Sequence, residues 1–308
     1  MLKRIFKWVF RIVILLILGI VIFGTIKQAI YDSNVESEFQ ATGDFSNIGE
    51  NKIHYTYLNK GDFTLIMIGG MGESMHTWST VADDLNQRGR VFMYDRSGLG
   101  FSAEGILPRS VDNVAIELHT VIKNENIPGP YLLVGHSAGG FIARYYAKKY
   151  PKDVVGLYLL DPYNGDVGAN DLPEEWPLSF KMMNWSFRKT SWSGIPFFLL
   201  PNPPHPTYKT SKAIKTYGNE AYAEKISLEQ FKKLDGVGKE MPLYLLRADN
   251  GNVKYNDLNH KWHKQIFDTY SNDINKFLTV KSGHHIHLQK PEVFLKTLDE
   301  FLTKLEML

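Results

Sequence analysis

Short apolar runs alternate with amphipathic stretches along most of this 308-residue chain. Runs of this length predict buried strands, and apolar residues at helical spacing between them predict helices. The predicted strands cover residues 52–58, 63–68, 90–94, 131–134, 154–160, 241–248 and 276–281. Strands that alternate with helices form a parallel sheet with helices on both faces. We therefore expect an α/β fold.

The first thirty residues follow a different pattern. Lys3, Arg4, Lys7 and Arg11 precede an uncharged apolar run over residues 12–26. Starting the run at Trp8 makes it long enough to cross a bilayer, with Arg11 reaching back to the interface. We expect an uncleaved transmembrane anchor over residues 1–31; a cleaved signal peptide and a buried helix are the alternatives. The basic N-terminal flank predicts a single-pass protein of the cell membrane with its folded domain on the extracytoplasmic side.

Charge and composition exclude several function classes. Residues 1–31 hold five of the 35 lysines and arginines and no acidic residue, so the rest of the chain is slightly acidic. We therefore expect no nucleic-acid partner. The chain has no cysteine, which excludes disulfides, a cysteine nucleophile and a thiolate metal site.

The predicted strands divide the chain into segments. Residues 32–50 are rich in acidic and turn-forming residues, and we expect a loop that tethers the domain. The core is predicted over 51–161 and 241–308. Residues 162–240 interrupt the alternation with tryptophans, phenylalanines and a proline-rich run at 201–206. We expect this insertion to be a helical cap whose aromatic residues wall an apolar substrate site; a purely structural excursion is the alternative.

One motif organises the core. Gly135-His136-Ser137-Ala138-Gly139 fits the G-x-S-x-G pattern, with an apolar strand before it and a helix after it. Such a strand–turn–helix places a serine at the apex of a strained turn, where its hydroxyl projects above the sheet. The flanking glycines leave room for that turn. We expect Ser137 to be a nucleophile.

A second glycine-rich turn, Gly69-Gly70-Met71-Gly72, follows the strand at 63–68. It lacks the Gly-Lys-Ser/Thr ending of a phosphate-binding loop, so we prefer an oxyanion hole. The backbone N–H groups of Met71 and Ala138 are the expected donors. A plain turn is the alternative.

A serine nucleophile needs a base and an acid that orients it. His284 follows Gly283 directly after the last predicted strand and is the expected base. Asp161 ends one strand and Asp249 the next, and either carboxylate could hold the imidazole; we favour Asp161. His284, His285 and His287 could instead bind a metal, but we expect no metal or other cofactor.

Together these motifs resemble the α/β-hydrolase superfamily over roughly residues 50–305. The motifs that carry the resemblance are Gly69–Gly72 with Trp78, Asp95–Ser102, Gly135–Gly140, and Gly283–Leu288 with Pro291-Glu292. The resemblance implies an eight-stranded, mostly parallel sheet with a helical cap. By position it implies that Ser137 is the nucleophile, His284 the base, and Met71 and Ala138 the oxyanion donors. The epoxide-hydrolase and dehalogenase branches are similar but place an aspartate where Ser137 stands.

The sequence therefore predicts a membrane-anchored serine hydrolase that cleaves small to medium, partly apolar carboxylic esters through an acyl-enzyme. An aminopeptidase or amidase is the enzymatic alternative and needs cap carboxylates, for which Glu174 and Glu175 are candidates. A non-catalytic binding module of the same fold is the third possibility.

Overall fold

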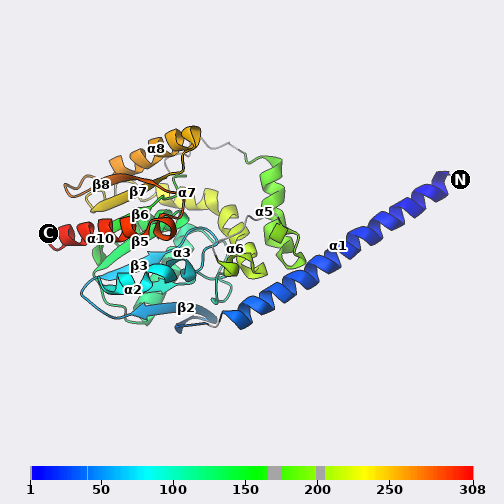
Figure 1. Cartoon of the computed structure of the whole chain (residues 1–308), viewed down its shortest axis with the longest axis horizontal. Coiled ribbons are helices and arrows are strands. Elements are labelled where there is room, and N and C mark those ends of the chain that lie inside the picture. The colour runs from blue at the N-terminus through cyan, green and yellow to red at the C-terminus, as the bar shows by residue number, and fades with distance from the viewer. Residues whose placement is uncertain (1, 40, 166–174, 199–204, 308) are drawn as a thin grey trace.

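The structure is a computed structural model of the whole chain, and it describes residues 2–39, 41–165, 175–198 and 205–307. A single twisted sheet of eight strands crosses the domain (Figure 1). The strands are β1 (Asp44–Ile48), β2 (Asn51–Leu58), β3 (Thr64–Ile68), β4 (Arg90–Tyr94), β5 (Tyr131–His136), β6 (Val154–Leu160), β7 (Leu243–Asp249) and β8 (Lys276–Lys281). Their order is β1-β2-β4-β3-β5-β6-β7-β8. The predicted eight-stranded sheet is confirmed.

The sheet is parallel from β4 to β8, and β1 and β2 join it antiparallel. Because its central strands are covered on both faces, every residue of β3 and β5 is buried. The alternating pattern of residues 52–58 is typical of an edge strand, but β2 lies inside the sheet, between β1 and β4. Its partner β1 lies outside it, in register from Asp44 opposite Tyr55 to Ile48 opposite Asn51.

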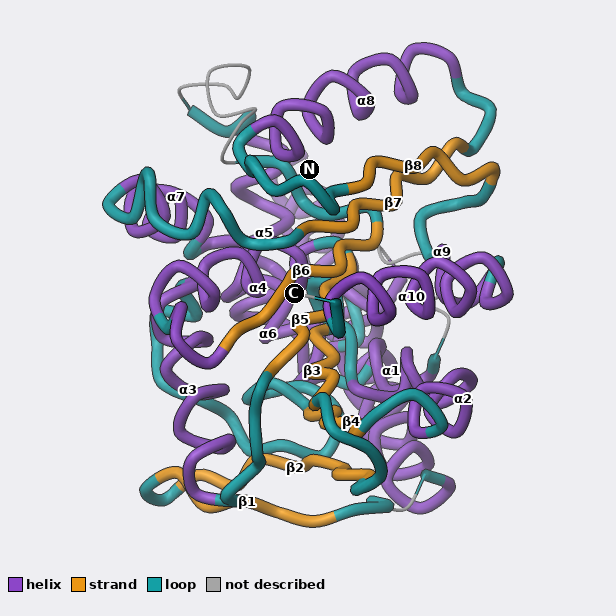
Figure 2. Tube along the Cα trace, turned by 90° about the vertical axis from the view of Figure 1, so that its left-hand side faces the viewer, coloured by secondary structure: helices purple, strands orange, loops and turns teal. Residues whose placement is uncertain are grey.

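Helices cover both faces of the sheet (Figure 2). One face packs against α3 (Val111–Asn124), α4 (Ala138–Lys149) and α8 (Val253–Asp268), and the other against α2 (Ala82–Asn86) and α10 (Pro291–Leu305). The short α9 (Ile286–Gln289) follows β8. Each face therefore buries its own apolar layer, as the alternating pattern predicts.

The insertion between β6 and β7 forms a helical layer beside the carboxyl ends of the strands (Figure 1). It contains α5 (Leu178–Thr190), α6 (Ser211–Tyr222) and α7 (Glu224–Lys232), with short 3₁₀ helices at Ser191–Ser193, Pro196–Phe198 and Pro206–Lys209. We call this layer the cap. Most of the proline-rich run at 201–206 lies outside the described residues.

The N-terminal segment is one helix, α1 (Leu2–Glu38). It is long and apolar enough to cross a membrane, and only 6% of its most apolar window is buried. The expectation of a loop over residues 32–50 is wrong. Helix α1 continues to Glu38, and β1 occupies part of the remainder. Gln28 and Val35, on the last turns of the helix, are buried, and Gln28 donates to the Lys209 carbonyl of the cap.

Candidate active site

Ser137 occupies the apex of a sharp turn between β5 and α4. Its backbone has φ of 52° and ψ of −122°, a conformation that costs free energy in a non-glycine residue. Three hydrogen bonds hold it there. The Ser137 N–H donates to the Leu160 carbonyl at 3.0 Å, and the Ser137 carbonyl accepts from the N–H groups of Gly140 (2.9 Å) and Tyr163 (2.8 Å). These hydrogen bonds therefore fix the orientation of the Ser137 backbone, and with it the direction in which the side chain leaves the turn.

The glycines of the motif are required by close backbone contacts. A Cβ on Gly139 would lie 2.1 Å from the Ile68 carbonyl oxygen, and a Cβ on Gly135 would lie 2.6 Å from the Gly139 carbonyl oxygen. Real atoms do not approach so closely, so side chains at these positions would push α4 away from β3 and β5.

His284 and Asp161 come together at the same end of the sheet. The Nδ1 atom of His284 lies 2.6 Å from Oδ2 of Asp161. The carboxylate is buried, whereas 42% of the His284 side chain is exposed. Nδ1 is therefore occupied by the acid, and Nε2 is the nitrogen left for proton transfer.

The two groups shift each other's protonation in opposite directions. Burial alone raises the pKa of Asp161, but hydrogen bonding to His284 and the nearby His263 bring it below its ordinary value. Burial alone lowers the pKa of His284, but the hydrogen bond and charge of Asp161 raise it above its ordinary value. A carboxylate that stays ionised beside an imidazole that readily accepts a proton suits an acid–base pair.

Asp161 is itself firmly held. Its φ is 42°, and its Oδ1 accepts from the Ala248 N–H (3.0 Å) and the Asn259 amide (3.3 Å). His263 stands 3.7 Å from the same oxygen. Both Asn259 and His263 lie on α8, and the sequence analysis missed them because only the fold brings α8 beside β6.

Asp249, the alternative acid, faces elsewhere. Its Oδ1 accepts hydrogen bonds from the Gly251 N–H at 3.0 Å and from the side-chain amide of Asn256. The carboxylate thus closes the turn after β7 and holds the start of α8. This geometry favours Asp161 over Asp249 as the partner of His284.

The turn after β3 places Met71 near Ser137. A Cβ on Gly70 would lie 3.1 Å from the Ser137 Cβ, so the two loops touch. Within the described part of the chain, the N–H groups of Met71 and Ala138 donate to no other residue. They are available to an oxyanion beside Ser137.

Two buried charged residues hold this turn. The Gly70 N–H donates to Oε2 of Glu73 at 2.6 Å. On the other side, the Arg96 guanidinium donates to the carbonyls of Gly69 and Gly70, both at 2.7 Å. Arg96 thus acts directly on the predicted oxyanion loop.

Glu73 also connects the serine and histidine loops. Its carboxylate lies 3.0 Å from Nδ1 of His136 and 3.0 Å from Nε2 of His285. The other nitrogen of His136 faces the His284 carbonyl at 3.1 Å. Burial alone raises the pKa of Glu73, but the neighbouring histidines bring it well below its ordinary value. The sequence analysis missed Glu73, since nothing local relates it to residues more than sixty positions away.

The three histidines considered as an alternative metal site contact different partners. His284 bonds Asp161, His285 bonds Glu73, and Nε2 of His287 lies 2.8 Å from the Thr77 hydroxyl. Among the residues that the structure describes, one group of potential ligands does converge: Glu73, His136 and His285 offer atoms within 4.8 Å of one another. Their facing atoms are already joined by hydrogen bonds. These hydrogen bonds link the loops that carry Ser137 and His284 through Glu73.

A small cavity of about 50 Å³ lies beside the two expected oxyanion donors. It is lined by Met71 and Ala138, by apolar residues of α3 and α4, and by Glu220 and Glu224 of the cap. A larger cavity of about 620 Å³ lies between α5 and the α6–α7 junction and touches none of the expected site residues. Of the two, only the smaller cavity contacts Ala138, the neighbour of Ser137.

The cap differs from its predicted role in two respects. Trp185 and Trp192 are exposed on its outer surface, so they do not wall the cavity beside Ser137. Glu175 is exposed and pairs with Lys181 at 2.6 Å, away from that cavity, and Glu174 lies outside the described residues. An aromatic residue on the outer surface and one that lines a cavity look alike in a sequence, so the sequence did not distinguish the two positions.

Comparisons with known proteins identify relatives. The chain is 27% identical over 233 residues to the protein YqjL of Bacillus subtilis, an alignment that covers 75% of this chain and 79% of that protein. It is 35% identical over 103 residues to the human (lyso)-N-acylphosphatidylethanolamine lipase, covering 32% of this chain and 30% of the lipase.

Solved structures share the fold. The Cif epoxide hydrolase from Acinetobacter nosocomialis superposes with a TM-score of 0.71 at 17% identity, covering 90% of this chain and 96% of that one. A carboxylesterase structure from Nitrososphaera gargenis gives a TM-score of 0.61 at 16% identity, covering 86% and 99%. The family model of the α/β hydrolase fold matches residues 64–273. With this match over most of the sheet and the whole cap, the chain belongs to the α/β-hydrolase family.

Proposed function

We propose that this chain is a membrane-anchored serine hydrolase that cleaves carboxylic esters. The observation that carries the proposal is the 2.6 Å contact between His284 Nδ1 and Asp161, at the sheet edge where Ser137 occupies a strained apex. A serine at this position supports ester chemistry over epoxide opening, because the epoxide-hydrolase branch that the sequence resembles uses an aspartate there.

In the proposed mechanism Ser137 attacks the ester carbonyl while Nε2 of His284 removes the hydroxyl proton. Asp161 keeps Nδ1–H in place and stabilises the imidazolium that forms. The N–H groups of Met71 and Ala138 receive the oxyanion. His284 then protonates the departing alcohol, and water activated by the same imidazole hydrolyses the acyl-enzyme.

The cavity supports a partly apolar substrate. Val114, Phe141 and Ile142 form apolar walls next to Ala138. A bound acyl or alcohol group can bury its hydrocarbon surface against these side chains. The partial similarity to a lipase acting on (lyso)-N-acylphosphatidylethanolamine agrees with such a substrate.

Fluorophosphonate labelling tests the serine without knowledge of the substrate. We expect the purified chain to be labelled, Ser137→Ala to lose the label, and the same preparations to release p-nitrophenol from p-nitrophenyl esters only when Ser137 is present. Folded protein that neither labels nor cleaves esters would refute the proposal and favour a binding module.

An aminopeptidase is the second candidate, because Glu220 and Glu224 line the cavity beside Ala138. Both carboxylates already have partners, which makes them weaker sites for a substrate ammonium group. Glu220 already pairs with Arg96, while burial raises the pKa of Glu224, which accepts a hydrogen bond from Tyr163. Preferential cleavage of aminoacyl-anilides over esters, lost in Glu224→Gln, would replace the ester proposal.

The anchor and its topology are a separate part of the proposal. Helix α1 places the basic residues at its N-terminal end before the apolar run, which supports a cytoplasmic N-terminus and an extracytoplasmic domain. We expect the full chain to stay with membranes after alkaline carbonate washing, and the domain to be digested by protease added outside intact spheroplasts. Release by the wash would contradict the anchor, and protection from the protease would reverse the topology.

A further inference from the structure

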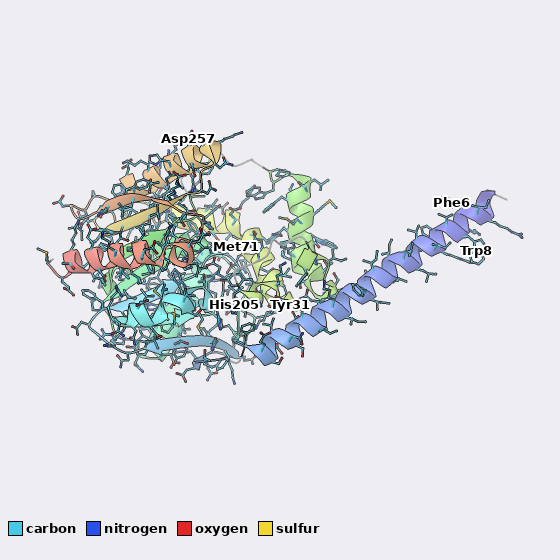
Figure 3. The ribbon with its side chains drawn as sticks, in the orientation of Figure 1. Phe6, Trp8, Tyr31, Met71, His205 and Asp257 are labelled. Atoms are coloured by element: carbon cyan, nitrogen blue, oxygen red, sulfur yellow. The ribbon has the colours of Figure 1, made fainter. Side chains whose placement is uncertain are left out.

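The last turns of α1 are fixed to the cap by side-chain hydrogen bonds. The Gln28 amide donates to the Lys209 carbonyl at 3.0 Å, and the Tyr31 hydroxyl to the Pro206 carbonyl at 2.9 Å. Asp32 accepts from the Ser211 N–H at 3.0 Å. Figure 3 shows Tyr31 where α1 meets the domain, whereas Phe6 and Trp8 lie near its far tip. The direction of α1 relative to the cap is thus set by these contacts.

The apolar run of α1 ends where the helix touches the cap. Gly24 packs so closely that a Cβ there would lie 2.3 Å from the Ser193 carbonyl oxygen. Residues 3–20, before this contact, are exposed throughout. From Phe6 to Gly24 the helix rises roughly 27 Å, close to the thickness of a bilayer's hydrocarbon core. A membrane that holds α1 therefore has its outer surface at the level of Ser191–Ser193.

The outer face of the cap at this level is apolar. Leu178, Met182 and Trp185 are exposed and recur at helical spacing along α5, with Trp185 also at the edge of the larger cavity, and Trp192 and Ile195 are exposed in the segment that follows the helix. Trp185 is 59% and Trp192 54% exposed. In Figure 1, α5 lies crosswise to α1 on the side of the domain from which α1 departs. We call these five side chains the outer cap face.

The charge of α5 fits a lipid surface. The helix carries Lys181, Arg188 and Lys189 and no acidic residue, although the chain beyond residue 31 is slightly acidic. An amphipathic helix with exposed tryptophan and flanking cations is typical of helices that lie in the interface of an anionic bilayer. Both ends of the span would then carry tryptophan, as membrane-crossing proteins commonly do.

We propose that the outer cap face lies in the interface of the bilayer that holds α1, so that the hydrolase takes amphipathic esters from the membrane. The inference rests on the proposed anchoring and deepens the proposed ester hydrolysis. Cap and anchor then form one membrane-facing unit, because α1 is packed on the cap rather than joined to it by a free linker. Met71, which lines the small cavity together with Glu220 and Glu224 of the cap, lies inside the domain, away from the tip of α1 (Figure 3).

Spin labels measure this arrangement directly, because the chain has no cysteine of its own. Single cysteines would replace Met182, Trp192, Leu15 and Glu306 in the full chain, which would be placed in vesicles of phosphatidylcholine and phosphatidylglycerol. All four side chains are exposed, so substitution leaves the packing intact. Accessibility to oxygen and to a water-soluble nickel chelate then gives the depth of each label. Leu15 reports the anchor, and Glu306 reports solvent at the opposite end of the domain.

We expect the labels at 182 and 192 to show at least threefold lower chelate accessibility than the label at 306, and the label at 15 to be deepest. Labels at 182 and 192 that resemble 306 while 15 is deep would overturn the cap proposal and leave the anchor intact. A label at 15 in water would overturn the anchoring. Spin–spin broadening at 182 and 192 with little access to either reagent would assign the face to a second copy of the chain and also overturn the proposal.

A kinetic measurement gives a second readout. We expect Met182→Ser with Trp192→Ser to keep its rate on a soluble p-nitrophenyl ester but to lose at least fivefold on an ester embedded in the same vesicles. Glu306→Ser is the control for surface substitution. Equal rates of the double variant and the wild type on the embedded ester would contradict delivery through the outer cap face.

Discussion

The Nε atom of Arg96 lies 2.9 Å from Oε1 of Glu220, joining the core loop after β4 to cap helix α6. The pair is almost fully buried, and Arg96 uses its other nitrogens on the carbonyls of the predicted oxyanion loop. The position of the cap is therefore coupled to the loop that carries Met71.

Removing the Glu220 carboxylate should affect both stability and activity. Glu220→Ala leaves a buried guanidinium without its counter-charge, and we expect the free energy of unfolding to fall by about 3 kcal/mol. The esterase kcat should fall as well, because Arg96 no longer holds the Gly69 and Gly70 carbonyls in one place. Chemical denaturation and ester kinetics measure the two effects.

Glu104 provides a matched control for this prediction. It also joins the core to α6, through Lys215 at 2.7 Å, but both side chains are exposed. We expect Glu104→Ala to cost less than about 1 kcal/mol, as exposed ion pairs usually do. Equal effects of the two variants would mean that the buried pair does not organise the loop.

Glu73 should act as a positioning residue. Its carboxylate holds Gly70 and His136, and His136 in turn bonds the carbonyl of His284. We expect Glu73→Gln to lower kcat by about 10-fold to 100-fold, since small displacements of reacting groups have effects of this size. KM should change little because Glu73 does not line the cavity.

The exposed Arg88–Asp299 pair gives the comparison for Glu73. Asp299→Asn removes a carboxylate of similar kind far from the site, and its kcat should equal that of the wild type. If Glu73→Gln keeps full kcat while melting at a lower temperature, Glu73 stabilises the fold only.

Sequence pattern predicted seven of the eight strands, because buried parallel strands need continuous apolar runs that few other structures need; β1 fell in a segment expected to be a loop. The glycine-containing turns after three of these strands singled out Ser137, Met71 and His284 as candidate site residues. The sequence pattern did not find Glu73, Asn259 or His263. These residues reach the site through tertiary contacts across the fold, and a polar residue in a loop or on a helix carries no local sign of its distant partner.

The acid is the sharpest test among the proposed site residues. Asp161→Asn should lower kcat by about 10⁴-fold, because an amide favours the wrong imidazole tautomer. Asp249→Asn should change kcat less than about threefold, since its carboxylate only closes a turn and holds Asn256. Ester kinetics measure kcat, and the rate of fluorophosphonate labelling reports how far Ser137 is still activated in each variant. A greater loss in Asp249→Asn would exchange their roles.

The pH profile follows from the direction of the His284 shift. Because the pKa of His284 is raised by its contact with Asp161, the neutral base becomes available at higher pH than in an ordinary histidine. We expect kcat/KM to rise with pH and its midpoint to lie above 6.5. In Asp161→Asn the raising contact is lost, so the midpoint of the residual activity should move to lower pH. A midpoint that is unchanged in this variant would show that another group controls the profile.

The elbow glycine gives a prediction about stability rather than chemistry. In Gly139→Ala the new Cβ would lie 2.1 Å from the Ile68 carbonyl oxygen and 2.7 Å from that of Gly69. Both neighbours are backbone atoms of the core, so relief requires α4 to move away from β3. We expect a loss of about 3 kcal/mol or more in unfolding free energy. Gly49→Ala is the control. Gly49 has a φ of 60°, but no atom lies within 4 Å of a Cβ built there. The substitution should therefore lower the unfolding free energy only by the cost of a left-handed backbone conformation, about 1 kcal/mol. Similar losses in the two variants, measured by urea denaturation, would mean that the elbow adapts to a side chain at 139, and that the packing between α4 and β3 does not require glycine there.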